Sequence, residues 1–346
     1  MPYLPSPVRS LFTNLDPVIV WASPERAPFV RAVLGELEYP IAGAGCEQAA
    51  RSGQVADALG THAVTDLRAA VGALERGTVL LASPGPFGSS ASDAEMVRQA
   101  RVRGVKFVAL EPVPGSVLDV AGAGWNRMDA GGRAIDAVAQ RPLIRLSGAV
   151  RNSADVLSQF GPVRTLAVES WSSAPEAPLA SLLWSAVDAA VWLQGEPVSV
   201  EAKHVGGQAG QGPTSLRSLT GDVIAVLTHD AGRLTNILCS DMGGRWNRSV
   251  TLVGDAGRLR VYDDGFEWVD AKGEKADELR TRRRGEAASF AVAEAADQLR
   301  RIIEGEENRG PDPADLLACV EAILLSARTG QVESPESIRR QAGLRQ

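Results

Sequence analysis

The chain has 346 residues, of which 45% are hydrophobic and 23% are charged, and its formal net charge is -6. This length predicts two domains rather than one small core, and the acidic balance argues against nucleic acid or an anionic membrane as a partner. Three scattered cysteines exclude a disulfide framework. Residues 1–16 form an N-terminal extension without an apolar run of signal-peptide length, so we expect a cytoplasmic protein.

The first third of the chain alternates short apolar runs with amphipathic segments. Apolar and β-branched runs predict buried strands at 18–21, 39–44, 63–65, 78–82 and 105–110. Apolar residues at helical spacing predict helices at 28–37, 48–59, 66–74 and 93–103. We expect Gly60 to end the second helix and Asp66 to cap the third. Apolar strands separated by helices indicate a parallel sheet covered on both faces, so residues 17–113 are predicted to form a doubly wound, Rossmann-like domain.

The pattern changes after residue 113. A long apolar segment predicts a helix over 179–193, ended by Gly195. Period-2 segments then predict strands, at 198–205, 222–229, 233–240, 249–253, 258–262 and 266–269. Asp-Ala-Gly and Asp-Asp-Gly tripeptides punctuate the later segments, which is typical of hairpin turns in an antiparallel meander. Two helices, at 287–303 and 313–328, complete an α+β domain over 114–330 with a large, mostly antiparallel sheet, and 331–346 form a tail.

Two glycine-rich or charged stretches of this second half are expected to be loops. Residues 206–212 are the candidate for a mobile loop, and the charge-dense segment 272–285 is expected to be a solvated loop. On the predicted strands, Ile224 and Val226 share one side, as do Leu234 and Leu238. These side chains either face the domain's own core or form a face that pairs with another subunit.

The order of several segments resembles the Gfo/Idh/MocA family of sugar and polyol oxidoreductases. Residues 49–66 resemble the family's second helix and third strand, 78–84 its fourth strand with the Thr/Ser-Pro turn, and 105–112 the strand before its Glu-Lys-Pro motif. Residues 178–202 resemble the substrate-domain helix with its exit strand, and 250–259 a late hairpin. The resemblance spans most of the chain. It implies NAD or NADP as the cofactor, a sugar-like ligand, and a homo-oligomer paired through the C-terminal sheet.

The loop after the first strand departs from this family. A dinucleotide fold binds pyrophosphate there with GxGxxG, whose glycines let backbone amides approach the phosphates. The chain contains 35 glycines, yet Ala22, Pro24 and Ala27 stand at the three glycine positions, and proline has no N–H to donate. Ser23 and Arg26 could form an altered phosphate loop. The alternative, which these residues favour, is a strand-to-helix turn without a nucleotide role.

Other cofactor positions are also changed. Glu25 puts a negative charge where a phosphate would lie, although Arg26 could offset it. Cys46 falls at the acidic position that would hold the ribose hydroxyls, and Glu47 could replace it if the turn shifts by one residue. Ser83-Pro84 is the cofactor-side element that the chain retains.

The resemblance also identifies the positions of the proton-transfer groups. The family uses the lysine of Glu-Lys-Pro together with an aspartate and a histidine on the substrate-domain helix. Here Glu111 is followed by Pro112, and Ser181 and Ser185 stand at the aspartate and histidine positions. Asp188, one turn further on, matches a family acid. A serine hydroxyl has no pKa near neutrality and cannot replace an imidazole as a base.

Two classes of function follow. The first is an NAD(P)-dependent oxidoreductase with impaired catalysis, and the second is a non-catalytic ligand-sensing, regulatory or scaffold protein on the same fold. A lesser alternative is a new acid/base or metal site built from His204, His229 and Asp241. With three histidines in the whole chain, a histidine-rich metal site is not expected, and we predict no metal.

Overall fold

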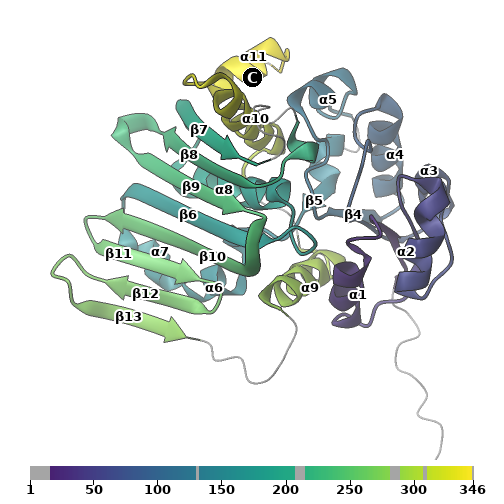
Figure 1. Cartoon of the computed structure of the whole chain (residues 1–346), viewed down its shortest axis with the longest axis horizontal. Helices are drawn as coiled ribbons and strands as arrows, with labels where there is room; N and C mark the ends of the chain where they lie inside the picture. The colour runs from purple at the N-terminus through teal and green to yellow at the C-terminus, as the bar shows by residue number, and fades with distance from the viewer. Residues whose placement is uncertain (1–15, 130–131, 207–214, 281–288, 307–309, 345–346) are drawn as a thin grey trace, which may run out of the picture.

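A computed structural model describes residues 16–129, 132–206, 215–280, 289–306 and 310–344. The chain forms one parallel and one mostly antiparallel sheet, which confirms the predicted α/β fold class. Figure 1 shows the large sheet on the left and the parallel sheet with its helices on the right. The parallel sheet with its helices therefore lies beside the large sheet.

The N-terminal sheet has five parallel strands in the order β2-β1-β3-β4-β5. The strands are β1 (Val18–Trp21), β2 (Ile41–Gly45), β3 (Gly77–Leu81), β4 (Val105–Ala109) and β5 (Val138–Gln140). The helices between them are α1 (Ala27–Gly35), α2 (Ser52–Leu59), α3 (Leu67–Ala73), α4 (Ala91–Val102) and α5 (Val117–Gly122). Neighbouring residues of β1 pack into two different hydrophobic clusters, so the sheet is covered on both faces.

The expected helix ends are confirmed at α2 and α3. Gly60 has the left-handed conformation that glycine adopts at a helix end, with φ of 69°. The Asp66 carboxylate accepts hydrogen bonds from the amides of Arg68 and Ala69, so it caps α3.

The N-terminal sheet differs from the prediction in two places. The strand expected at 63–65 is reduced to an isolated bridge between Ala44 and Ala63. The chain leaves the sheet after two hydrogen bonds with Ala44 because Asp66 already starts α3. A fifth strand, β5, joins the sheet beyond the boundary predicted at residue 113, and α9 (Phe290–Ile303) supplies part of the cluster that covers one face of the sheet.

The C-terminal sheet has eight strands in the order β13-β12-β11-β10-β6-β9-β8-β7. They are β6 (Val163–Ser173), β7 (Ser199–Val205), β8 (Asp222–Thr228), β9 (Leu234–Ser240), β10 (Met242–Gly254), β11 (Gly257–Tyr262), β12 (Gly265–Val269) and β13 (Lys275–Arg280). Strand β6, which lies parallel to β9, separates two antiparallel runs. The sequence predicts one continuous antiparallel meander. This prediction is wrong, because β6, a strand that the prediction does not include, pairs parallel with β9.

Strand β13 corrects the expectation of a solvated loop over 272–285 for residues 275–280, while residues 281–285 lie outside the described residues. It pairs with β12 at the edge of the sheet, and all six of its residues are exposed. A strand that is exposed on both sides does not alternate between apolar and polar residues, so the usual sequence pattern of a strand is absent from β13. Of the expected mobile loop 206–212, residues 207–212 lie outside the described residues.

Helices cover one side of the large sheet. Figure 1 shows α6 (Gly148–Asn152), α7 (Ala154–Phe160) and α8 (Leu179–Gln194) behind it, while α10 (Pro313–Thr329) lies along β7 and α11 (Pro335–Gln341) packs against α10. Short 3-10 segments are η1 (Ala49–Arg51), η2 (Ala134–Ala137), η3 (Ile144–Leu146), η4 (Leu216–Ser218) and η5 (Asp230–Gly232). In the described part of the chain, no helix combines the length and the apolar character needed to cross a bilayer.

Candidate functional site

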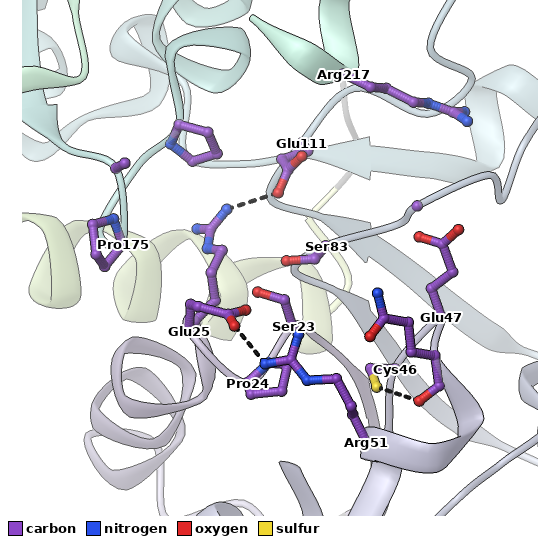
Figure 2. Close-up of a pocket in the computed structure, with 15 residues that line it drawn as sticks. Ser23, Pro24, Glu25, Cys46, Glu47, Arg51, Ser83, Glu111, Pro175 and Arg217 are labelled. Atoms are coloured by element: carbon purple, nitrogen blue, oxygen red, sulfur yellow. Dashed lines mark hydrogen bonds and ion pairs between the residues drawn. The ribbon is translucent and has the colours of Figure 1, made fainter. Parts of the chain in front are cut away.

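A cleft of about 540 Å³ lies at the carboxyl ends of the parallel strands, where it meets the segment between β6 and α8. This is the edge at which doubly wound sheets bind ligands. Its charged lining is balanced, with three arginines and three glutamates: Arg26, Arg51, Arg217, Glu25, Glu47 and Glu111. Figure 2 labels five of these six residues, all but Arg26, around the opening, together with Ser23, Ser83 and Pro175.

The turn between β1 and α1 offers few free amides to an anion. The amides of Arg26 and Ala27 donate to the Ser23 carbonyl oxygen, at 3.0 and 3.1 Å. Pro24 and Pro28 have no N–H. The donors with which a helix N-terminus binds phosphate are therefore already used or missing at four positions.

The Arg26 side chain is buried and joins three segments at the base of the cleft. Its Nη1 atom donates to Glu111 Oε1 and to the Ala82 carbonyl oxygen, both at 3.0 Å. Its Nη2 atom donates to the Glu176 carbonyl oxygen, at 3.2 Å, on the segment before α8. Arg26 thus links the loops of the parallel sheet to the segment between β6 and α8. Burial raises the pKa of Glu111, and the neighbouring Arg26 opposes this shift.

A second ion pair lies at the rim of the cleft. Arg51 Nη2 donates to Glu25 Oε1 at 2.5 Å (Figure 2). Hydrogen bonds from Arg51, from the Glu25 amide and from the Ser23 hydroxyl hold the pKa of the Glu25 carboxyl below its ordinary value. Unlike the Arg26–Glu111 pair, this one is exposed to solvent.

Both residues after β2 that the sequence offers for the ribose side, Cys46 and Glu47, line the cleft. Cys46 is buried, and its Sγ donates to the Gln48 carbonyl oxygen at 3.0 Å, so this thiol is already used within the turn. Glu47 is exposed and lines the cleft. A Cβ atom on Gly85 would lie 2.4 Å from Glu47 Oε2, so a glycine there lets the carboxylate approach the loop after β3. Of the retained dipeptide, Ser83 lines the cleft, whereas Pro84 lines a neighbouring hollow of about 340 Å³ that Glu47 also borders.

The positions matched to the proton-transfer groups lie outside the lining of the cleft. Ser181 donates its hydroxyl to the Leu110 carbonyl oxygen, and Ser185 Oγ accepts a hydrogen bond from the Ile144 amide at 2.9 Å. Asp188 forms a buried ion pair with Arg145, with Nε 2.8 Å from Oδ2. Burial raises the pKa of Asp188, against the effect of Arg145.

Pro112, the fourth such position, is also buried and follows Glu111 at the end of β4. Pro112 is therefore part of the packing, Ser181 and Ser185 bond to backbone groups, and Asp188 forms a buried ion pair. The helix α8 presents no proton-transfer group to the cleft from these positions.

The alternative site built from two histidines and Asp241 does not assemble. His204 is paired in register with Val223, six residues before His229 along β8, which separates the histidines by about 20 Å. His229 is buried, with Nε2 3.0 Å from Thr235 Oγ1, and burial lowers its pKa. Asp241 accepts from the Gly221 amide at 2.8 Å. Within the described ranges, no three His, Cys, Asp or Glu side chains lie together as metal ligands would.

Two arginines of the cleft were missed by sequence reasoning. Arg51 belongs to η1, and its pairing with Glu25 joins residues that are 26 positions apart. Arg217 belongs to η4 in the second domain, and its Nη2 donates to the Phe87 carbonyl oxygen at 2.8 Å. Neither arginine lies in a motif, so no signal in the sequence places them at the cleft.

No protein-family model and no curated protein matches the sequence of this chain. Solved structures do match its fold. An NAD-binding oxidoreductase from Klebsiella pneumoniae is 13% identical, with a TM-score of 0.65, and the match covers 93% of this chain and 99% of that one. An oxidoreductase from Agrobacterium radiobacter, in complex with NAD+, L-tartaric acid and magnesium, is 15% identical, with a TM-score of 0.65 and coverages of 94% and 100%.

A third similar structure is UDP-N-acetylglucosamine 3-dehydrogenase from Acidithiobacillus ferrooxidans, 16% identical, with a TM-score of 0.63 and coverages of 90% and 97%. Similarity at this level of identity concerns the fold. The fold expected from the resemblance to oxidoreductases of the Gfo/Idh/MocA type is confirmed.

The residues of the cleft do not fit a dinucleotide bound in the way this fold implies. A pyrophosphate at the β1–α1 turn would meet the Glu25 carboxylate and two prolines. The buried Arg26 is already neutralised by Glu111, so it offers no unpaired positive charge to a phosphate. On the ribose side the fit is better, because Glu47 lines the cleft where an acid would hold hydroxyl groups.

Proposed function

We propose that this protein is a non-catalytic ligand-binding member of the oxidoreductase fold, in which the interdomain cleft takes a small sugar-like ligand and performs no hydride transfer. The observation that carries the proposal is the structural use of Ser181 and Ser185. Each hydroxyl is committed to a backbone group, and neither lines the cleft. A base that could take a proton from a substrate hydroxyl is therefore missing from the positions that the fold would use.

The cleft suits a polyhydroxylated ligand. Carboxylates accept hydrogen bonds from hydroxyl groups and guanidinium groups donate to their oxygens, and the lining supplies Glu47 and Arg217 for these two roles. Pro175 and Pro178 add apolar surface against which a sugar ring can pack. The volume, about 540 Å³, lies within the range of small-molecule sites.

The proposal predicts separate outcomes for binding and for chemistry. The protein is incubated with each nicotinamide cofactor and a panel of aldoses and cyclic polyols, and the absorbance of the reduced nicotinamide is followed. We expect no turnover above a blank without protein. Members of the same panel should raise the unfolding temperature in the absence of any cofactor. Turnover with any pair would overturn the proposal.

The second candidate is an NAD(P)-dependent oxidoreductase with an altered cofactor site. The position of Glu47 favours it, because a carboxylate at the end of the second strand is where a ribose would be held. Solved structures of similar fold include complexes with NAD+ or NADH. If the protein is an oxidoreductase, Glu47→Gln should weaken the binding of NAD or NADP. If it is a non-catalytic binding protein, the same variant should weaken the binding of the sugar-like ligand and leave the dinucleotides unbound.

We further propose that the chain pairs through the open face of the large sheet. Ile224, Val226 and Leu234 are 53%, 37% and 40% exposed on that face, so they do not belong to the domain's own core. Exposed apolar side chains grouped on one face are typical of an interface. Ile224→Arg should convert a dimer into a monomer, as measured by light scattering, without lowering the unfolding temperature. A wild-type protein that is monomeric at high concentration would contradict this proposal.

A further inference from the structure

The Glu25 carboxylate is held by a donor of the kind that binds a phosphate. It lies in the turn between β1 and α1, the segment that surrounds the pyrophosphate in a dinucleotide fold. Its Oε1 atom accepts a hydrogen bond from the Arg51 guanidinium at 2.5 Å, and the pKa of the carboxyl is lowered chiefly by this arginine. Guanidinium groups are also common ligands of phosphate oxygens.

We propose that Glu25 is a built-in anion that fills the phosphate position of the cleft, so that the cleft selects neutral sugar-like ligands over phosphorylated ones and over dinucleotides. The inference deepens the proposed function and rests on it for the sugar-like class of ligand. The exclusion is electrostatic. A phosphate would have to displace Glu25 from Arg51, or share the turn with a like charge.

The two ion pairs of the cleft make Glu25 the residue to test. The Arg26 and Glu111 side chains are 7% and 16% exposed, and Arg26 also holds two backbone oxygens, so that pair is part of the packing. The Glu25 and Arg51 side chains are 60% and 37% exposed. Removing the Glu25 charge should therefore leave the fold intact and release the Arg51 guanidinium for another anion.

Charge balance leads to the same conclusion. Three arginines and three glutamates line the cleft, so the wild-type lining offers no net attraction for an anion. Glu25→Gln leaves one positive charge in excess and keeps the size of the side chain. Glu47→Gln changes the net charge of the lining equally, but Glu47 is not paired with Arg51, so this variant releases no arginine. It is the matched control.

The test is calorimetric titration of inorganic pyrophosphate and of NAD+ into full-length wild type, Glu25→Gln, Glu47→Gln and the double variant Glu25→Gln/Arg51→Gln at low ionic strength. We expect Glu25→Gln to bind pyrophosphate about tenfold more tightly than wild type, because the Arg51 guanidinium no longer donates to a carboxylate and can form charge-assisted hydrogen bonds with the pyrophosphate. Glu47→Gln should gain much less, and the double variant should lose the gain. Salt should weaken the binding.

The outcomes separate this inference from the proposed function. Equal pyrophosphate affinity of Glu25→Gln and wild type, in proteins with equal unfolding temperatures, would overturn the role of Glu25. A gain in Glu47→Gln as large as that in Glu25→Gln would also overturn it, because net charge alone would then be responsible. Turnover of a sugar by wild type with a cofactor would instead overturn the proposed function. The pyrophosphate affinities of the variants would still test the role of Glu25, because they do not depend on turnover.

Discussion

The two halves of the cleft region hold their polar side chains in different ways. Around α8, Ser181 and Ser185 bond to backbone groups, and the Asp188 and Arg145 side chains are 1% and 5% exposed. At the β1–α1 turn, the Glu25 and Arg51 side chains are 60% and 37% exposed. The polar groups around α8 are therefore part of the packing, whereas the ion pair of the turn lines the cleft and contacts solvent.

This difference predicts different responses to mutation. Buried charged and polar groups that lose a partner are costly, because solvent cannot replace the lost interaction. An exposed ion pair contributes little, because water and salt already compete with it. Changes on α8 should therefore act on stability, and changes at the turn should act on binding.

The largest effect is expected at Asp188. Asp188→Ala removes the carboxylate that neutralises Arg145 in the interior, and we expect a loss of about 3–5 kcal/mol in the free energy of unfolding. Asp188→Asn keeps an acceptor for Arg145 and should lose less. Denaturant unfolding measures both variants. A loss below about 1 kcal/mol for the alanine variant would mean that the Asp188–Arg145 pair contributes no more to stability than an exposed ion pair does.

A smaller loss is expected at Ser185. Ser185→Ala leaves the buried Ile144 amide without its acceptor, which should cost about 1–3 kcal/mol. Ser158→Ala is the control, because the Ser158 hydroxyl donates to the Asp155 carbonyl oxygen at an exposed position. Equal unfolding free energies for the two variants would show that the Ser185 hydroxyl has no structural role.

Among the buried groups, His229 should make the stability of the protein depend on pH. Burial lowers its pKa in the folded protein below the ordinary value of about 6.5, so the unfolded chain binds more protons between the two values. Stability should therefore fall as the pH drops from about 7 to 5. His229→Gln cannot take up this proton and should lose less stability over the same interval. The raised pKa values of Glu111 and Asp188 act in both proteins and cancel in the comparison. Identical pH profiles would contradict the buried, neutral histidine.

The smallest effect on stability is expected at Glu25. Glu25→Gln removes an exposed ion pair and should change the free energy of unfolding by less than about 1 kcal/mol, while it changes anion binding. Thermal unfolding of the wild type and the variant in the same buffer measures the first quantity. A variant as unstable as Asp188→Ala would remove the distinction between the two halves.

Much of the fold could be predicted from local pattern. Buried parallel strands such as β1 and β3 consist of continuous apolar residues, and Gly60 and Asp66 mark helix ends by their own chemistry. Strands β6 and β13 could not be found in this way. Strand β13 has no buried face, so no period-2 apolar signal exists there.

The cleft was predictable only in part. The missing glycines and the missing lysine are visible in the sequence because a motif defines their places. The partners of Arg26 are not, because Glu111 and the Glu176 carbonyl oxygen lie 85 and 150 positions away. Both Cys46 and Glu47 line the cleft, but the turn after β2, which the sequence does not reveal, leaves the Glu47 carboxylate exposed and ties the Cys46 thiol to the Gln48 carbonyl oxygen.

We infer that the cleft does not bind a nicotinamide dinucleotide. This is tested by the free energy of unfolding of the wild-type protein with and without NAD+, NADH, NADP+ and NADPH. We expect no change with any of the four. A ligand present at 100 times its dissociation constant from the folded state stabilises that state by about 2.7 kcal/mol, and an increase of that size with any dinucleotide would show that the cleft binds it.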